Sequence, residues 1–176
     1  PLETRLPETP VKPSYLRTVK PGDEISKGTL QLLATSFGQS QLAAQLRYDV
    51  KSFVITYSTT YKGEAIEASG LMMVPSGMDT AASFVSLQHG TEFRKSDAPS
   101  LKSGLQGLEF FASAGYVTVM PDFLGYGSSD SIFHPYYDRQ YAAAAVIDLI
   151  KATKEYLQQE GILIIDKLCL AAYSEG

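Results

Sequence analysis

The amino-acid sequence predicts an α/β fold in which a mostly parallel sheet is preceded by an antiparallel hairpin. Short, mostly apolar runs at 83–87, 116–120 and 168–172 alternate with longer stretches whose apolar residues recur every three or four positions. Strands of that kind are typical of parallel sheets, because helices cover both of their faces. A second observation is a pair of β-branched and aromatic runs, 53–61 and 65–74, which a short turn separates, as in a hairpin.

Length and composition fit a soluble globular domain with a sizeable core, since 44% of the 176 residues are apolar and 19% are charged. A formal net charge of -4 gives no broad positive field, so a nucleic-acid partner is not expected. No apolar run reaches the roughly 18 residues that a membrane span requires. The single cysteine, Cys169, cannot form an intrachain disulfide.

Residues 1–50 are expected to form an N-terminal arm and short helices ahead of the main domain. Prolines recur through residues 1–23, which disfavours a helix and a central strand alike and predicts an extended lead-in. Between Ile25 and Leu46 the apolar spacing predicts two short helices, which Gly38 separates. These helices are expected either to form a flap or, as the pattern favours, to pack on the outside of the sheet.

The main domain, 51–176, is predicted to continue from the hairpin into strands that alternate with helices. After the strand at 83–87, a polar loop leads to a helix that ends near Gly115. The strand at 116–120 then stops at Pro121, and a long helix is predicted from about 138 to 159. The strand at 168–172 completes the pattern, and each crossover between parallel strands is expected to be right-handed.

The strongest candidate for a catalytic residue is Ser174, in the sequence Ala-Tyr-Ser-Glu-Gly at 172–176. This is a form of the G-x-S-x-G nucleophile elbow in which Ala172 replaces the first glycine. Such a pattern arises by chance on the order of once in ten chains of this length. Its position directly after an apolar strand is the one an elbow requires, and it favours the elbow over a solvent-facing serine in a turn.

A second candidate loop, Gln-His-Gly-Thr at 88–91, also follows a predicted strand. Gly90 would let the backbone approach a substrate carbonyl, so that the N–H groups of Thr91 and Glu175 could both bind its oxygen. That arrangement would form an oxyanion hole. The alternative is a simple glycine turn in which His89 is a hydrogen-bonded turn histidine.

A third loop, at 121–129, contains Asp122 and the glycines 125 and 127. The glycines permit a tight loop at the carboxyl end of the sheet, where open α/β sheets bind ligands. Asp122 is expected to accept backbone hydrogen bonds that fix this loop, rather than to act as a catalytic acid. A phosphate-binding loop is a weaker alternative, because the loop has no Lys or Arg and the spacing does not match a P-loop.

In their order along the chain, the three loops resemble the landmarks of the α/β-hydrolase superfamily, in its esterase and lipase branch, which includes secreted lipases and related bacterial esterases. The resemblance covers roughly residues 51–176. It implies the α/β-hydrolase fold, Ser174 as the nucleophile, and oxyanion-hole N–H groups from Thr91 and Glu175. It also implies substrate contacts at His89, Gly90 and Tyr126, and structural roles near the site for Asp122, Gly125 and Gly127.

The same resemblance places the catalytic acid and histidine after the serine along the chain, and this sequence holds neither there. Both histidines precede Ser174: His89 belongs to the second loop, and His134 with Pro135 is expected to start the long helix. We therefore expect the fold to be incomplete, and unstable by itself, without a C-terminal half. That half is expected on a second polypeptide.

The function expected from these residues is the cleavage of carboxylic esters through an acyl-enzyme on Ser174. An amide or peptide hydrolase of the same fold is the nearest alternative, and a binding protein that has lost activity is another. Neither a metal ion nor an organic cofactor is implied. The resemblance to secreted lipases favours a secreted or periplasmic location, and a cytoplasmic one stays open.

Overall fold

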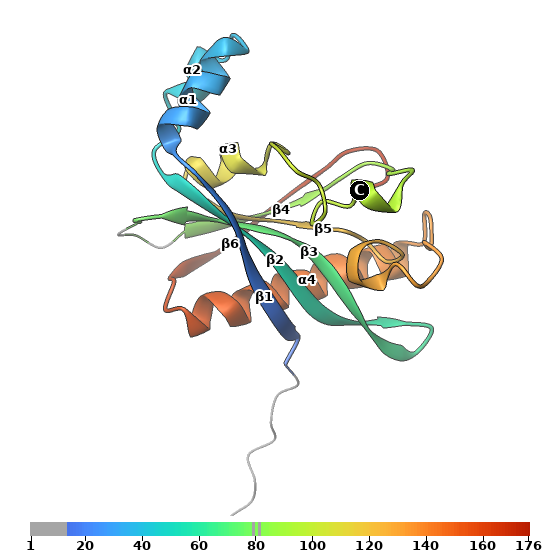
Figure 1. Ribbon diagram of the computed structural model, residues 1–176. Coiled ribbons are helices and arrows are strands. Elements are labelled where there is room, and N and C mark those ends of the chain that lie inside the picture. Colours follow the sequence, from blue (N-terminus) through green and yellow to red (C-terminus); the bar gives the residue numbers. More distant parts are fainter. Residues whose placement is uncertain (1–13, 79, 81) are drawn as a thin grey trace, which may run out of the picture.

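A computed structural model describes residues 14–78, 80 and 82–176, and it shows a six-stranded sheet in the order β1-β2-β3-β5-β4-β6. In Figure 1 the helix α4 covers one face of the sheet, and the helix α3 lies on the other with α1 and α2 beyond it. The strands are β1 (Leu16–Ile25), β2 (Asp49–Tyr61), β3 (Glu64–Ser76), β4 (Ala82–Gln88), β5 (Tyr116–Pro121) and β6 (Ile164–Ala172). The helices are α1 (Lys27–Ser36), α2 (Ser40–Ala43), α3 (Leu108–Ser113) and α4 (Arg139–Gln159), with single 3₁₀ turns at Lys95–Asp97 and Gly127–Ser129.

Part of the predicted lead-in arm belongs to the sheet. Residues 1–13 lie outside the described residues, but β1 pairs antiparallel with β2 along most of its length. Because β1 is the outermost strand of the sheet, Pro21 can stand in it without interrupting a hydrogen-bond ladder on both sides. The start of β1 is tied to α4, since the Glu155 carboxylate accepts hydrogen bonds from the N–H groups of Tyr15 and Leu16.

The predicted hairpin is present as β2 and β3, whose register runs without a break from the Asp49–Ser76 pair to the Tyr61–Glu64 pair. The two residues between the strands, Lys62 and Gly63, have φ angles of 51° and 84°. A two-residue turn with positive φ at both positions matches the right-handed twist of the paired strands.

The sheet combines antiparallel and parallel strands. β4 is parallel to both β5 and β6, as the apolar runs predict. β1 pairs antiparallel with β2, β2 with β3, and β3 with β5, so antiparallel pairs make up the N-terminal side. The α/β class and the hairpin are confirmed. The additional edge strand β1, which the sequence does not predict, makes the antiparallel side of the sheet one strand wider.

Two apolar cores hold the layers together. The larger core packs α4 against the sheet, with Leu149 and Leu157 of the helix among residues such as Ile55, Met72 and Val119. The second core lies between the sheet, α3 and the two N-terminal helices. Leu30 of α1 is completely buried in it, so α1 and α2 pack as part of the fold rather than as a free flap.

The strand β6 differs from the rest of the sheet in its exposure. It pairs with β4 on one side, and within the described part of the chain no strand pairs with its other side. Leu168 and Leu170 are 47% and 64% exposed, although both are large apolar residues in a strand. An exposed apolar edge strand is a surface on which further strands can pair.

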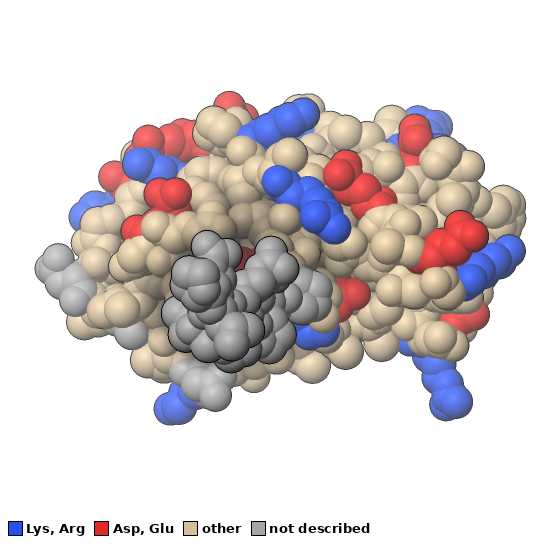
Figure 2. Space-filling model, turned by 90° about the horizontal axis from the view of Figure 1, so that it is seen from below, with Lys and Arg blue, Asp and Glu red and all other residues tan. Residues whose placement is uncertain are grey.

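The charged residues show no surface of a single sign in the view that Figure 2 gives. Lys and Arg side chains are interspersed there with Asp and Glu side chains. No helix among the described residues is long and apolar enough to cross a membrane.

Substitution of Gly70 in β3 tests how tightly this strand packs against β5 and α4. A Cβ at this position would lie 2.7 Å from the Met120 carbonyl oxygen and 3.0 Å from a methyl group of Leu149. We therefore expect Gly70→Ala to lower the free energy of unfolding by about 1–3 kcal/mol, the usual cost of overpacking.

The matched control is Gly28→Ala in α1, where an added Cβ meets nothing closer than 3.8 Å. Alanine restricts the unfolded chain, so this change is expected to stabilise the protein by about 0.4–1 kcal/mol. Urea unfolding of the natural protein that carries this sequence measures both values. Equal effects of the two substitutions would contradict the packing described here.

Candidate active site

The structure brings the three predicted loops together at the carboxyl ends of β4, β5 and β6. The last residues of β4 and β6 are neighbours in the sheet, because Gln88 is paired with Ala172. Beyond this pair the Tyr173 N–H donates to the Gln88 carbonyl, over 3.2 Å between nitrogen and oxygen. The loop at 88–91 and the turn at 172–176 therefore leave the sheet side by side.

Ser174 occupies a strained turn directly after β6. Its φ angle is 57°, in the left-handed region that residues with a side chain rarely adopt. The turn is closed by the Gly176 N–H, which donates to the Tyr173 carbonyl over 3.1 Å. A Cβ at Gly176 would lie 2.5 Å from the Gln88 Cβ, so only glycine fits there. This is the geometry of a nucleophile elbow, in which a tight strand-ending turn exposes the serine.

Gly90 of the second loop also lies against the elbow. A Cβ at this position would lie 2.9 Å from a ring carbon of Tyr173 and 3.3 Å from the Cβ of Ser174. Within the described residues, no acceptor lies within hydrogen-bond reach of the N–H groups of Thr91 or Glu175, and no partner lies within reach of the Ser174 hydroxyl. The two N–H groups thus have no hydrogen bond within this part of the chain, as the predicted oxyanion hole requires.

His89 is directed into the protein rather than toward a substrate. Its Nδ1 lies 2.7 Å from the Gly90 carbonyl oxygen, and its ring packs on Phe123 with 4.8 Å between ring centroids. Because a carbonyl only accepts, Nδ1 carries the hydrogen. Nε2 is buried and has no hydrogen-bond partner among the described residues. The His89 side chain is thus that of a hydrogen-bonded turn histidine that shapes the loop around Gly90, and this leaves the backbone N–H of Thr91 available for the predicted oxyanion hole.

Asp122 anchors the third loop from a fully buried position. One carboxylate oxygen accepts from the Ser100 N–H at 2.8 Å, and the other accepts from the hydroxyls of Ser69 and Ser100 at 2.6 Å and 2.5 Å. The Ser69 hydroxyl in turn accepts from the Ser128 N–H at 2.8 Å. A Cβ at Gly127 would overlap both the Ser69 hydroxyl and the Asp122 carboxylate. This network fixes the loop, and no sequence pattern indicates that the serines at 69 and 100 belong to it.

His134 does not start the long helix, contrary to the sequence prediction. The helix begins at Arg139, and the Asp138 side chain caps it by accepting from the Gln140 N–H. His134 lies in the preceding loop, with Nδ1 2.6 Å from the Leu124 carbonyl oxygen and Nε2 2.7 Å from a carboxylate oxygen of Glu175. Sequence reasoning missed this contact, which joins residues 41 positions apart.

Gly125 leaves room for that histidine. A Cβ at Gly125 would lie 2.6 Å from the Cα of His134. The neighbouring Tyr126 packs its ring edge-on to the imidazole, with 4.8 Å between centroids, and its hydroxyl donates to the Glu92 carbonyl over 2.5 Å. Burial, with smaller contributions from the charges of Glu175 and Glu92, raises the pKa of Tyr126. Tyr126 is therefore held as a neutral donor.

A cavity of about 310 Å³ opens beside Thr91 and His134. Phe93 and Phe133 on its rim are 92% and 88% exposed. The cavity is lined mainly by aromatic and other apolar side chains, which suits an apolar part of a ligand next to the elbow. Its lining residues include Thr91, Phe93, Tyr126, Phe133, His134 and Tyr136, but not His89 or Gly90.

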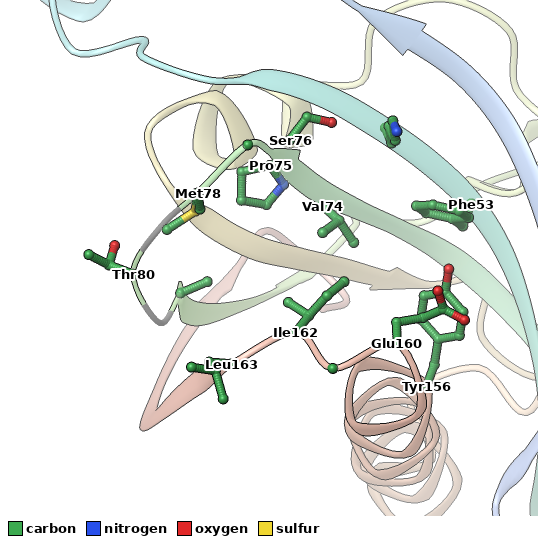
Figure 3. Close-up of a pocket in the computed structure, with 14 residues that line it drawn as sticks. Phe53, Val74, Pro75, Ser76, Met78, Thr80, Tyr156, Glu160, Ile162 and Leu163 are labelled. Atoms are coloured by element: carbon green, nitrogen blue, oxygen red, sulfur yellow. The ribbon is translucent and has the colours of Figure 1, made fainter.

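A larger cavity of about 440 Å³ lies at the opposite end of the parallel strands. Figure 3 shows its walls, which are formed by the end of β3, the segment before β4 and the end of α4. Phe53 and Tyr156 meet on one side of it, with 5.6 Å between ring centroids. Because it lies where β4 and β6 begin, it is separate from the elbow where they end.

Substitution of Asp122 tests how much its hydrogen bonds contribute to the free energy of unfolding. Asp122→Ala leaves three buried or half-buried donors without an acceptor and is expected to cost about 2–4 kcal/mol of unfolding free energy. Asp122→Asn keeps the shape and part of the network, and it is expected to cost less.

The pKa of Asp122 is raised from 3.8, with burial as the largest cause and the serine hydrogen bonds opposing it. A raised pKa means that the folded protein holds the Asp122 proton more tightly than the unfolded chain does. The contribution of this proton to the free energy of unfolding is therefore complete below about pH 3.8, the ordinary pKa, and is lost as the pH rises through the folded-state pKa. The stability of the wild type relative to Asp122→Asn should therefore decrease between pH 4 and pH 7 in urea titrations. An increase over that range would contradict the assignment.

Substitution of Gly90 tests whether its close approach to Ser174 matters for activity. Gly90→Ala places a methyl group against Tyr173 and Ser174 and should push the second loop away from the elbow. A displacement of about 1 Å at a reacting centre costs up to roughly 10²-fold in rate. We expect the ester-cleaving activity that the sequence predicts to fall at least tenfold while the midpoint of urea unfolding changes little. Full activity in this variant would show that the close approach does not matter.

No family model matches the chain, and no curated protein sequence matches it significantly. Solved structures do. A Legionella pneumophila protein assigned as a hydrolase is 32% identical over 93% of this chain and 45% of its own, with a TM-score of 0.81. The rice cell wall degrading esterase LipA from Xanthomonas oryzae is 27% identical over 92% of this chain and 42% of its own, with a TM-score of 0.81.

Candida antarctica lipase A shares the fold at 18% identity, over 92% of this chain and 35% of its own, with a TM-score of 0.59. The chain spans less than half the length of each of these proteins. The part it spans includes the mixed sheet, which matches that of α/β-hydrolase esterases. The chain therefore has the α/β-hydrolase fold and resembles the esterase and lipase branch of that superfamily over nearly all of its length.

Proposed function

We propose that this chain carries the nucleophile of a serine hydrolase that cleaves carboxylic esters through an acyl-enzyme on Ser174. The observation that carries the proposal is the strained backbone of Ser174, with φ of 57°, at the end of β6 and against Gly90. A serine in that conformation costs about 1–3 kcal/mol, and such strain gathers at functional sites. The likeness to the esterase LipA favours an ester over an amide as the substrate.

In the proposed reaction the Ser174 oxygen attacks the ester carbonyl carbon as its proton passes to a histidine base. The carbonyl oxygen becomes negative and accepts hydrogen bonds from the N–H groups of Thr91 and Glu175, each worth about 10²–10³-fold in rate. The bond to the leaving alcohol then breaks, and the histidine returns the proton to that alcohol. Water attacks the acyl-enzyme by the same steps and releases the acid.

The base and its acid partner are proposed to come from a C-terminal half of the hydrolase. Neither His89 nor His134 has a hydrogen bond to Ser174, and both are engaged elsewhere. The exposed apolar residues Leu168 and Leu170 on β6 support this proposal, because further strands added to that edge, with the helices that connect them packed on the sheet face, would cover them. The expectation that this half is a second polypeptide is tested by an intact mass spectrum of the natural protein, which a single long species would contradict.

Substitution of Ser174 tests the proposed nucleophile in the natural protein. Ser174→Ala should lower kcat on p-nitrophenyl esters on the order of 10⁶-fold, because no other residue can form the acyl-enzyme. A fluorophosphonate probe should label the wild type on Ser174 and leave the variant unlabelled, as peptide mass spectrometry would detect. Amino-acid anilides should be cleaved far more slowly than esters.

The control is Ser36→Ala on the exposed side of α1, which should retain both labelling and activity. Labelling without ester cleavage, but with anilide cleavage, would identify an amide hydrolase instead. A folded wild-type protein that neither reacts with the probe nor cleaves esters would be a binding protein, and the proposal would fail.

A further inference from the structure

One loop contacts both of the residues that are proposed to bind the oxyanion. It is the segment 132–138, between the third loop and α4. The Tyr136 hydroxyl lies 3.2 Å from the Thr91 side-chain oxygen, and His134 Nε2 lies 2.7 Å from a Glu175 carboxylate oxygen. Thr91 and Glu175 lie in the loops that follow two different strands, β4 and β6, which are neighbours in the sheet. The segment 132–138 thus bridges the two sides of the oxyanion hole.

His134 is itself fixed on several sides. Its Nδ1 lies 2.6 Å from the Leu124 carbonyl oxygen, and its ring packs edge-on against Tyr126 and Tyr136, at centroid distances of 4.8 Å and 6.0 Å. The side chains of His134 and Glu175 are only 17% and 7% exposed. Because both side chains are held firmly, the contact between them restrains the elbow relative to the segment 132–138.

The contact between His134 and Glu175 requires a shared proton. Because the Leu124 carbonyl only accepts, Nδ1 of His134 carries a hydrogen. Nε2 then either donates to the Glu175 carboxylate as part of an imidazolium or accepts from the protonated carboxyl group. A neutral imidazole beside a carboxylate would place two lone pairs 2.7 Å apart, with no hydrogen between them. In both of the arrangements above the pair therefore holds one more proton.

We propose that His134 and Tyr136 are positioning residues that hold the N–H groups of Glu175 and Thr91 in place for the oxyanion, with the His134–Glu175 contact as the main restraint. The proposal rests on the proposed function, because it concerns the same site. Its physical basis is that oxyanion stabilisation depends on donors fixed before the reaction begins. The Glu175 N–H follows a strained residue, Ser174, so it needs a restraint from outside the turn.

The test compares kcat and KM for p-nitrophenyl ester hydrolysis in variants of the natural protein. Glu175→Ala and His134→Ala each remove the contact but leave the Glu175 N–H in place, and each is expected to lower kcat about 10–100-fold while KM changes less than about threefold. The double variant should be no slower than either single one, since both lose the same restraint. Tyr136→Phe should lower kcat about three- to tenfold.

Glu175→Gln is the conservative variant that separates positioning from a general structural role. Its side-chain amide can donate to Nε2 of a neutral His134, so kcat should stay within about threefold of the wild type. Tyr137→Phe is the matched control for Tyr136→Phe, because the Tyr137 ring is 68% exposed and its hydroxyl has no hydrogen bond within the described part of the chain. It should leave both kinetic constants unchanged.

Two outcomes would overturn the inference: unchanged kcat in folded Glu175→Ala and His134→Ala proteins, or an equal loss in Glu175→Gln and Glu175→Ala. If the alanine variants fail to fold, the near-isosteric variants Glu175→Gln and Tyr136→Phe test the inference instead. Glu175→Gln should keep kcat within about threefold of the wild type, and Tyr136→Phe should lower it about three- to tenfold; a Tyr136→Phe protein as fast as the wild type would overturn the inference. Failure of the proposed function looks different, because the wild-type protein would then show neither ester hydrolysis nor labelling of Ser174.

Discussion

The site depends on the packing of two backbones where β4 and β6 end. Gln88 and Ala172 are paired in the sheet, and beyond them the glycines 90 and 176 let the two loops approach without side chains between them. A Cβ at either glycine would meet its neighbour at 2.5–2.9 Å. The parallel register therefore does more than build the sheet, because it brings the Ser174 turn and the Thr91 loop to the same place.

The remaining loops act as supports for that contact. Asp122 connects β3, β5 and the segment around Ser100 through buried hydrogen bonds, which hold the third loop beside the elbow. The same loop provides the Leu124 carbonyl that orients His134, and His134 reaches Glu175. The backbone from Asp122 to Leu124 thus connects the hydrogen bonds of Asp122 in the core to those of His134, which reach the residue after the nucleophile. Such buried networks stabilise one geometry when all their members have partners.

Local patterns predicted the features that local physics determines. The hairpin, the two strand–helix–strand units and the small residues around Ser174 each have a signal within a few positions. Strand β1 was not predicted, because the prolines that exclude a central strand are compatible with an edge, and edge placement is a property of the whole sheet. The His134–Glu175 contact spans 41 positions and leaves no periodic trace. For His89, the sequence left two roles open, a substrate contact or a turn histidine, and the contacts of its ring with the Gly90 carbonyl and Phe123 depend on packing that the sequence does not reveal.

The exposed apolar edge of β6 and the coverage of less than half of the matched hydrolase and esterase structures both support the proposal that a C-terminal half supplies the base for the serine. We propose that this chain contributes the nucleophile and both oxyanion donors to the complete site. A crystal structure of the complete protein treated with a phosphonate that reacts with serine nucleophiles tests this proposal. The phosphonate is expected on Ser174, with a phosphoryl oxygen about 2.7–3.1 Å from the backbone nitrogens of both Thr91 and Glu175. A phosphonate bound to another residue, or an oxygen that contacts neither nitrogen, would contradict it.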